Sequence, residues 1–244
     1  MNNTKKYELV LDDTIKVAGR TLFRIKALKD FSNVSVGSLG GYIEEEENLF
    51  QQGDCWVYDN AKVFGEARVM GDAQIRENAQ VFDRAWVYGQ AMIWGNAQIC
   101  GQSQIADTSF IDSDTIVTGK AKVYENVYLS GSTFVAGDAM ISNNVAITHD
   151  NNVITGGTIY CGRYCGDARI ASDDDYLVIR GLGSVNRSTT FYRTAKNSIK
   201  VACGCFSGFL DEFIEEVKKT HKDTKYAREY LTMVEVAKIH FELC

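Results

Sequence analysis

The sequence contains no proline among its 244 residues. Average usage near 5% would place about a dozen prolines in a chain of this length. Proline has no backbone N–H to donate to a β-ladder, so continuous hydrogen-bonded ladders tolerate it poorly. The absence therefore favours a protein built largely of paired strands.

The chain also lacks an excess of basic residues and any long apolar run. Its formal net charge is -6, which argues against a general nucleic-acid binder because that affinity depends on Lys and Arg neutralising phosphates. The opening MNNTKKYELVLDD has no apolar signal-peptide core, and no run approaches the roughly 18 residues of a membrane span. Seven scattered cysteines fit reduced thiols. We expect a soluble, cytoplasmic protein that binds neither nucleic acid nor membrane.

Residues 54–161 consist of consecutive six-residue units, beginning DCWVYD, NAKVFG, EARVMG, and we expect no insertion among them. The second place is usually small, often Ala, and the fourth place is always aliphatic. The fourth-place residues are Val57, Val63, Val69, Ile75, Val81, Val87, Ile93, Ile99, Ile105, Ile111, Val117, Val123, Leu129, Val135, Ile141, Ile147, Val153 and Ile159. Such a period indicates stacked repeats, each contributing one interior side chain.

Three units bring the chain back to its starting point one strand spacing higher, so eighteen residues make one coil. The region predicts six coils, a prism about 29 Å long at about 4.8 Å per rung. The sixth place is Gly in many units and often Asp or Asn elsewhere, which are the residues that tolerate unusual corner angles. The sequence therefore predicts a mainly β prism with an aliphatic interior.

This pattern resembles the hexapeptide-repeat family. The resemblance implies a left-handed parallel β-helix and, commonly, a homotrimer. The stretch GSLGGYIEEEENL, followed by GDCWVYDNAKVFG, also resembles members frequent in bacteriophage and prophage genomes. That resemblance implies a phage-type protein acting in the cytoplasm of a bacterial host.

Segments outside the repeat predict two smaller parts. Residues 1–53 are expected to form a β-hairpin that turns at Ala18-Gly19 and caps the open end of the array. Residues 54–171 form the β-helix, and residues 172–244 are expected to form an α+β domain. That domain should contain three strands (Tyr176 to Ile179, Thr189 to Tyr192, Ile199 to Val201) and two helices, the first capped by Ser207 and the second by Asp223 or Thr224.

One outward face of the predicted prism is rich in large apolar residues. An apolar patch of this kind marks burial, against a neighbouring subunit or against the terminal segments of the same chain. We favour a symmetric oligomer, and the family resemblance implies a trimer. The residues concerned are Trp56, Tyr58, Met92, Trp94, Phe110 and Tyr128.

His149 and Asp150, in the stretch ITHDN, are the candidate catalytic residues. Many acyltransferases that the chain resembles use a histidine as general base on a substrate hydroxyl or amine, for which a pKa near neutrality is suited. Those enzymes usually interrupt their coils with a loop that closes the cleft, and residues 54–161 contain none. The alternative is that His149 is an ordinary corner residue.

A polar loop in the last domain is the candidate ligand site. Glycine lets a backbone approach an anion closely, and the arginine fork fits phosphate oxygens. The loop matches no P-loop or dinucleotide motif, and an ordinary hairpin turn is the alternative. A small phosphorylated, nucleotide-like ligand is the specific expectation. The residues are Gly183, Ser184, Asn186, Arg187, Ser188, Thr189, Tyr192 and Arg193.

Four cysteines raise the question of zinc. Cys161 and Cys165 are spaced as ligands often are, but Cys203 and Cys205 are separated by one residue, unlike ordinary zinc knuckles. We favour reduced structural thiols, and we expect neither a metal nor a cofactor.

Three functions remain open at this stage. The first is non-enzymatic binding of a phosphorylated small molecule, which for a phage-type protein suggests sequestration of a nucleotide signal in host defence. The second is acyl or acetyl transfer from an acyl-CoA with His149 as base. The third is a structural adaptor whose aromatic faces bind protein.

Overall fold

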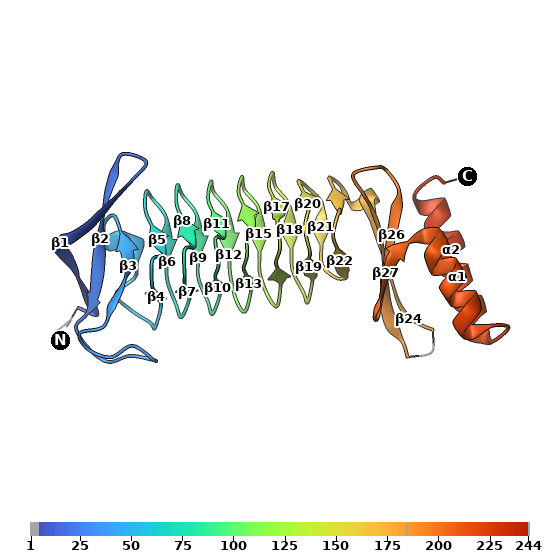
Figure 1. The fold of residues 1–244 in the computed structure, drawn as a ribbon, viewed down its shortest axis with the longest axis horizontal. Helices are drawn as coiled ribbons and strands as arrows, with labels where there is room; N and C mark the ends of the chain where they lie inside the picture. The colour runs from blue at the N-terminus through green and yellow to red at the C-terminus, as the bar shows by residue number, and fades with distance from the viewer. Residues whose placement is uncertain (1–4, 184, 244) are drawn as a thin grey trace.

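The computed structural model describes residues 5–183 and 185–243, which form a rod with a β-hairpin at one end and two helices at the other (Figure 1). Between these ends lies a parallel β-solenoid of about seven turns. The predicted fold class, mainly β with an N-terminal cap and a small C-terminal α+β part, is confirmed. Neither helix in the described residues is long and apolar enough to cross a membrane.

Three parallel sheets form the faces of the solenoid, and successive strands in each sheet come from successive turns. The first face contains β3 (Leu39–Ile43), β5 (Lys62–Val63), β8 (Gln80–Val81), β11 (Gln98–Ile99), β14 (Ile116–Val117), β17 (Thr133–Val135), β20 (Asn152–Ile154) and β23 (Arg169–Ile170). The second face contains β4 (Trp56–Val57), β7 (Gln74–Ile75), β10 (Met92–Ile93), β13 (Phe110–Ile111), β16 (Tyr128–Leu129), β19 (Ala146–Thr148) and β22 (Arg163–Cys165). The third face contains β6 (Arg68–Val69), β9 (Trp86–Val87), β12 (Gln104–Ile105), β15 (Lys122–Val123), β18 (Met140–Ile141) and β21 (Thr158–Ile159).

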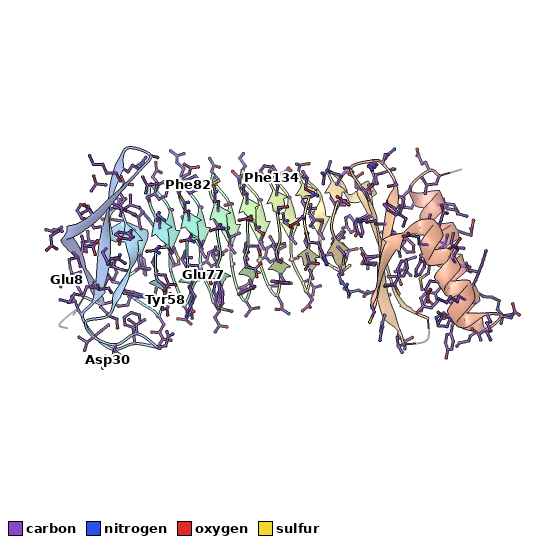
Figure 2. The ribbon with its side chains drawn as sticks, viewed as in Figure 1. Glu8, Asp30, Tyr58, Glu77, Phe82 and Phe134 are labelled. Atoms are coloured by element: carbon purple, nitrogen blue, oxygen red, sulfur yellow. The ribbon has the colours of Figure 1, made fainter. Side chains whose placement is uncertain are left out.

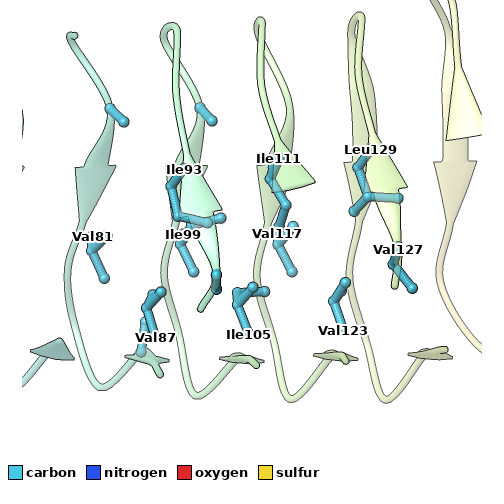
Figure 3. Close-up of a cluster of buried hydrophobic side chains, with 14 of the residues drawn as sticks. Val81, Val87, Ile93, Ile99, Ile105, Ile111, Val117, Val123, Val127 and Leu129 are labelled. Carbon is cyan, nitrogen blue, oxygen red and sulfur yellow. The ribbon is translucent and has the colours of Figure 1, made fainter. Parts of the chain in front are cut away.

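The fourth-place aliphatic residues fill the interior, as Figure 3 shows for three consecutive turns. Ile105, for example, is completely buried and pairs with Val87 and Val123 on the neighbouring rungs. Fully burying one such side chain contributes about 1.5–3 kcal/mol. The repeated column of these contacts is what holds the rod together.

The corners explain the sixth place of the repeat. Every sixth-place residue from Asp59 to His149 has a positive φ, between 52° and 73°. Glycine adopts this conformation at no steric cost, and Asn and Asp tolerate it better than most residues. Acidic corner side chains also accept backbone N–H groups of the adjacent turn, as Asp83 does from Gly101 at 3.1 Å and Asp107 from Glu125 at 3.0 Å.

The expected six coils and uninterrupted register need correction. Ile43 pairs with Val63 before the repeat, and Tyr164 pairs with Ile147 after it, so the interior extends beyond residues 54–161 in both directions. Val153 was expected inside, but Ile154 is the buried residue and pairs with Val135. One extra residue therefore occupies the preceding corner.

Asn152 accommodates this insertion. It is completely buried, and its amide donates to the carbonyls of Thr148 and His149 at 3.1 and 3.0 Å. Ile159 pairs with Ile141 at the original spacing of eighteen residues, so the unit that ends there is one residue short. The inserted residue is thus compensated within the same turn.

The N-terminal hairpin consists of β1 (Tyr7–Val17) and β2 (Arg20–Ala27), with Ala18 and Gly19 at the turn. β2 pairs antiparallel with β3, which extends the first face, and a 3-10 turn, η1 (Glu46–Asn48), follows. Lys6 is 1% exposed, and its ammonium donates to the Cys55 carbonyl at 2.9 Å. Burial lowers the pKa of Lys6. The hairpin segment thus satisfies backbone groups that the first turn would otherwise leave unpaired.

The C-terminal module follows a short 3-10 turn, η2 (Asp173–Asp175). Its antiparallel sheet has the order β24 (Tyr176–Leu182), β25 (Arg187–Arg193), β26 (Ile199–Cys203) and β27 (Phe206–Phe209). The helices are α1 (Leu210–His221) and α2 (Lys225–His240). The fourth strand was not expected.

The helix caps were predicted with mixed success. Ser207 lies inside β27, so its predicted capping role is wrong: the first helix is capped at Phe209, whose N–H donates to the Glu212 carboxylate at 2.7 Å. Thr224 caps the second helix by accepting from the Ala227 N–H, as predicted.

Candidate functional site

The C-terminal sheet separates two different environments. Side chains alternate across a strand, so Tyr192 and Ala202 pack with the last solenoid turn whereas Phe191 and Val201 pack with the helices. Tyr192 is completely buried and accepts the Cys165 N–H at 3.0 Å. Its burial raises its pKa to about 12. One face of the sheet thus closes the rod, and the other supports α1 and α2.

A pocket of about 280 Å³ opens where the β24–β25 connection, β26, β27 and the two helices meet. Its volume is near the lower end of small-molecule sites, which run from about 300 to 1,000 Å³. It is lined by Val185, Arg187, Cys203, Phe206, Phe213, Glu216, Val217, Thr220, His221 and Tyr230.

Four rings follow one another along this pocket. The Phe206 and Phe213 centroids lie 5.3 Å apart, and Phe213 meets Tyr230 edge-on at 5.9 Å. His221 continues the series, 5.2 Å from Tyr230. These separations are typical of attractive aromatic pairs, so the wall is a packed surface able to receive one more ring.

Polar groups stand beside this aromatic wall. Arg187 is exposed and makes no ion pair within residues 5–183 and 185–243. Glu216 accepts the Thr220 hydroxyl at 2.9 Å on the α1 side. An unpaired guanidinium next to aromatic rings is suited to an anion carried on a ring.

The structure brings only part of the predicted ligand loop to this pocket. Arg187 lines it, while Asn186 and Ser188 are exposed and Ser184 lies outside the described residues. Gly183 is tied to α2, because its N–H donates to Glu229 at 2.8 Å.

The remaining predicted ligand residues point elsewhere. Thr189 is buried and donates to the Cys203 sulfur at 3.2 Å, while Tyr192 faces the solenoid. Arg193 pairs with Asp175 at 3.3 Å and donates to the Phe241 carbonyl at 3.2 Å. These side chains hold the module together and do not converge with Arg187.

His149 occupies an exposed corner near the C-terminal module, with a φ of 65°. Its Nδ1 lies 2.9 Å from the Thr148 hydroxyl. The Asp150 carboxylate accepts the Ser132 N–H of the neighbouring turn at 3.0 Å. His149 therefore bonds to Thr148 and Asp150 to Ser132, so the two neighbouring side chains do not form a hydrogen-bonded pair in the described residues.

The aromatic residues of the second face have different environments. Trp56 is 1% exposed, because Tyr7 and Phe31 of the N-terminal segment pack against its ring at 6.0 and 5.3 Å. Tyr58 donates to Asn33 at 2.6 Å, and Figure 2 shows it beside the N-terminal cap. For these two residues the chain itself supplies the cover.

Farther along that face, a column of rings stays partly exposed. Trp94 and Phe110 lie 5.3 Å apart, and Phe110 and Tyr128 lie 5.5 Å apart. Tyr128 is 37% exposed. Met92 is half-buried on the same face.

The cysteines proposed for zinc have other neighbours. The Arg163 guanidinium donates to Cys165 Sγ at 3.1 Å, and Cys205 is exposed. Burial raises the pKa of the Cys161 thiol. Across residues 5–183 and 185–243, no three His, Cys, Asp or Glu side chains are placed to share a metal ion.

Sequence reasoning missed most of the pocket. Phe213 and Val217 lie one helical turn apart on the buried side of the first helix, and Thr220 continues the same helical spacing. The same spacing continues to His221, and this periodicity was the signal in the sequence that these residues share one side of the helix. The contribution of Phe206 was hidden because the fourth strand was not expected.

Comparison with known proteins gives a local similarity. No protein-family profile matches the chain. The Escherichia coli (strain K12) protein YdcK, named as an uncharacterized acetyltransferase, is 49% identical over 45 residues. The matched stretch is 18% of this chain and only 14% of that protein. Together with the solenoid, this similarity fits a protein of the hexapeptide-repeat type.

Proposed function

We propose that the protein is a small-molecule-binding protein whose rigid solenoid carries a ligand pocket in the C-terminal module. The observation that carries this proposal is the 280 Å³ pocket, in which an aromatic wall stands beside Arg187, a side chain with no ion pair among the described residues. The ligand class is a ring that bears an anionic group, such as a nucleoside phosphate. Sequestration of such a molecule is the role that this proposal assigns.

The pocket size limits the ligand. At about 280 Å³ it accepts one ring system with a phosphate near Arg187, and a dinucleotide would extend into solvent. His221 stands at the same wall, with its ring tilted by 31° against that of Tyr230, and its ring nitrogens are polar groups that can donate to or accept from a ligand.

Thermal-shift measurements test the binding proposal. We expect a nucleoside monophosphate or cyclic nucleotide to raise the Tm, because a ligand that binds only the folded state stabilises it by mass action. Arg187→Gln should remove the shift. Arg228→Gln, on the exposed side of α2, is the matched control and should retain it.

Two outcomes would contradict the proposal. One is the absence of any shift with mononucleotides, cyclic nucleotides and ADP-ribose at millimolar concentration. The other is an equal shift in the wild type and Arg187→Gln, which would place the ligand outside this pocket.

Acyl transfer is the second candidate. It is favoured by the local similarity to a protein named as an acetyltransferase and by the exposure of His149. Asp167 of the adjoining turn and Lys200 of the module form an ion pair at 3.1 Å beside this corner. In this proposal His149 takes a proton from an acceptor hydroxyl or amine.

The substitution His149→Asn separates the two candidates. Asparagine suits the left-handed corner, as Asn143 does at an equivalent place with a φ of 62°. We expect the fold to be unchanged and acetyl-CoA consumption to fall if His149 is the base. Wild-type consumption by the variant, or none by the wild type, rejects acyl transfer.

We also propose that the exposed ring column of the second face contacts other subunits of a homotrimer. The Trp94 indole nitrogen is buried without a hydrogen-bond partner in the described residues, which fits a partner group supplied by a neighbour. Native mass spectrometry measures the assembly directly, and a monomer at micromolar concentration would contradict this part.

A further inference from the structure

Tyr88, Ala106 and Tyr124 occupy the same outward position on three successive rungs of the third face. They directly follow β9, β12 and β15, which lie side by side (Figure 1). Backbone hydrogen bonds fix this alignment. The Tyr88 N–H donates to the Ile105 carbonyl and the Ala106 N–H to the Val123 carbonyl, both at 2.9 Å. The three side chains therefore form one column.

On the first face, aromatic residues at consecutive places of such a column stack on each other. Phe64 and Phe82 lie at the equivalent place of two successive turns, and their rings stack at 5.1 Å with an angle of 3°. Phe82 is partly buried and packs against the cluster formed by Leu22, Tyr42 and Phe64. The solenoid thus stacks outward rings at one per rung.

The column on the third face has alanine where its middle ring would be. Two rungs span about 9.6 Å, close to twice the ring separation seen between Phe64 and Phe82. Tyr88 and Tyr124 therefore lie two rungs apart, on either side of the smaller Ala106. A pocket of about 150 Å³ is present here, lined by Tyr88, Gln104, Ala106, Asp107, Lys122 and Tyr124. An apolar cavity of about 150 Å³ holds one benzene.

One polar residue of this slot, Lys122, can meet an anionic substituent. The Lys122 ammonium makes no ion pair in the part of the chain that the structure describes. The Asp107 carboxylate already accepts the Glu125 N–H at 3.0 Å. Lys122 is therefore the group available to a ligand charge.

We propose that this slot is a second binding site, which takes a single planar aromatic ring bearing a carboxylate or another anion. The ring stacks between Tyr88 and Tyr124 above Ala106, and the anion meets Lys122. The site lies on the solenoid and does not depend on the C-terminal pocket.

Ligand-detected saturation-transfer NMR on the full chain tests the proposal with benzoate. Cyclohexanecarboxylate has the same charge and a similar size but no planar ring, and methyl glucoside is an uncharged saccharide. We expect transfer to benzoate and at least about tenfold less to the other two, since stacking on an aromatic side chain is worth this much or more. Equal transfer to all three probes would overturn the assignment.

Ala106→Phe supplies the missing ring from the protein itself. The Phe64 and Phe82 pair shows that the rod accommodates consecutive rings at this place, so the variant should fold and lose benzoate binding. Ala136→Phe adds a ring at the equivalent place of the first face and should retain binding. Benzoate binding that survives in a folded Ala106→Phe variant would place the probe elsewhere. If Ala106→Phe does not fold, Tyr124→Ala is measured instead, and undiminished binding there gives the same refutation.

Discussion

Replacing Gly131 by alanine tests whether the corners of the solenoid are stacked backbone on backbone. Gly131 has a φ of 73° and lies directly below His149 of the next turn. A Cβ at this position would lie 2.6 Å from the His149 carbonyl carbon and closer still to its oxygen. Since the obstructing atoms belong to the backbone, the rung itself must shift.

The expected loss of stability combines three contributions. The left-handed conformation costs an alanine about 1–2 kcal/mol. Forcing the added methyl group against the next corner costs about 1–3 kcal/mol. Restricting the unfolded chain offsets about 0.4–1 kcal/mol. The net expectation is a destabilisation of about 2–4 kcal/mol.

Gly19→Ala is the matched control. Gly19 has a similar φ of 79°, but nothing lies within 4 Å of its added Cβ. In this variant only the left-handed backbone conformation lowers the free energy of unfolding, by about 1 kcal/mol after the same offset.

Thermal unfolding followed by circular dichroism distinguishes the two substitutions. One kcal/mol lowers Tm by about 2–4 °C in a chain of this size, so Gly131→Ala should lose about 4–16 °C. Equal Tm losses in the two variants would refute the stacked-corner argument.

Three further predictions concern other parts of the chain. Asn152→Ala should destabilise by about 2–4 kcal/mol in urea unfolding, because it leaves buried backbone groups without partners; a loss below 1 kcal/mol would contradict its role at the inserted corner. Wild-type stability should fall by about 2 kcal/mol between pH 10 and pH 12 through Tyr192, because the unfolded phenol ionises near pH 10 while the folded one holds its proton to a pKa of about 12. Tyr192→Phe should be less stable at pH 8 and lose less on this rise, and parallel pH curves would disprove it. Thr224→Ala should cost about 1 kcal/mol, and an unchanged Tm would argue against the cap.

The solenoid could be predicted from the sequence because each rung repeats the same requirement. One aliphatic residue fills the interior, and one residue at the corner adopts a positive φ. Both requirements are local, so residue type reports them directly. The ladder from Val57 to Ile147 was therefore placed correctly.

Prediction failed where two residue types meet the same requirement. Val153 and Ile154 are both β-branched aliphatics, so hydrophobicity alone does not say which of them enters the interior. The buried side chain of Asn152 settles the register through hydrogen bonds that only the folded corner provides.

The C-terminal pocket depends on contacts between distant segments. Arg187 was identified from its loop, but its neighbours Phe206 and His221 come from a strand and a helix whose packing the sequence pattern does not specify. The predicted loop residues Tyr192 and Arg193 were instead used to join the module to the rod and to α2.

Because successive turns are nearly equivalent, the length of the rod can change by whole turns. Residues eighteen positions apart occupy the same place on neighbouring rungs, as Val63 and Val81 do on the first face. If eighteen residues are removed or duplicated, the N-terminal hairpin and the C-terminal module still pack against the same kinds of turn. Unequal recombination within the gene can therefore lengthen or shorten the protein in steps of about 4.8 Å without redesign of either end.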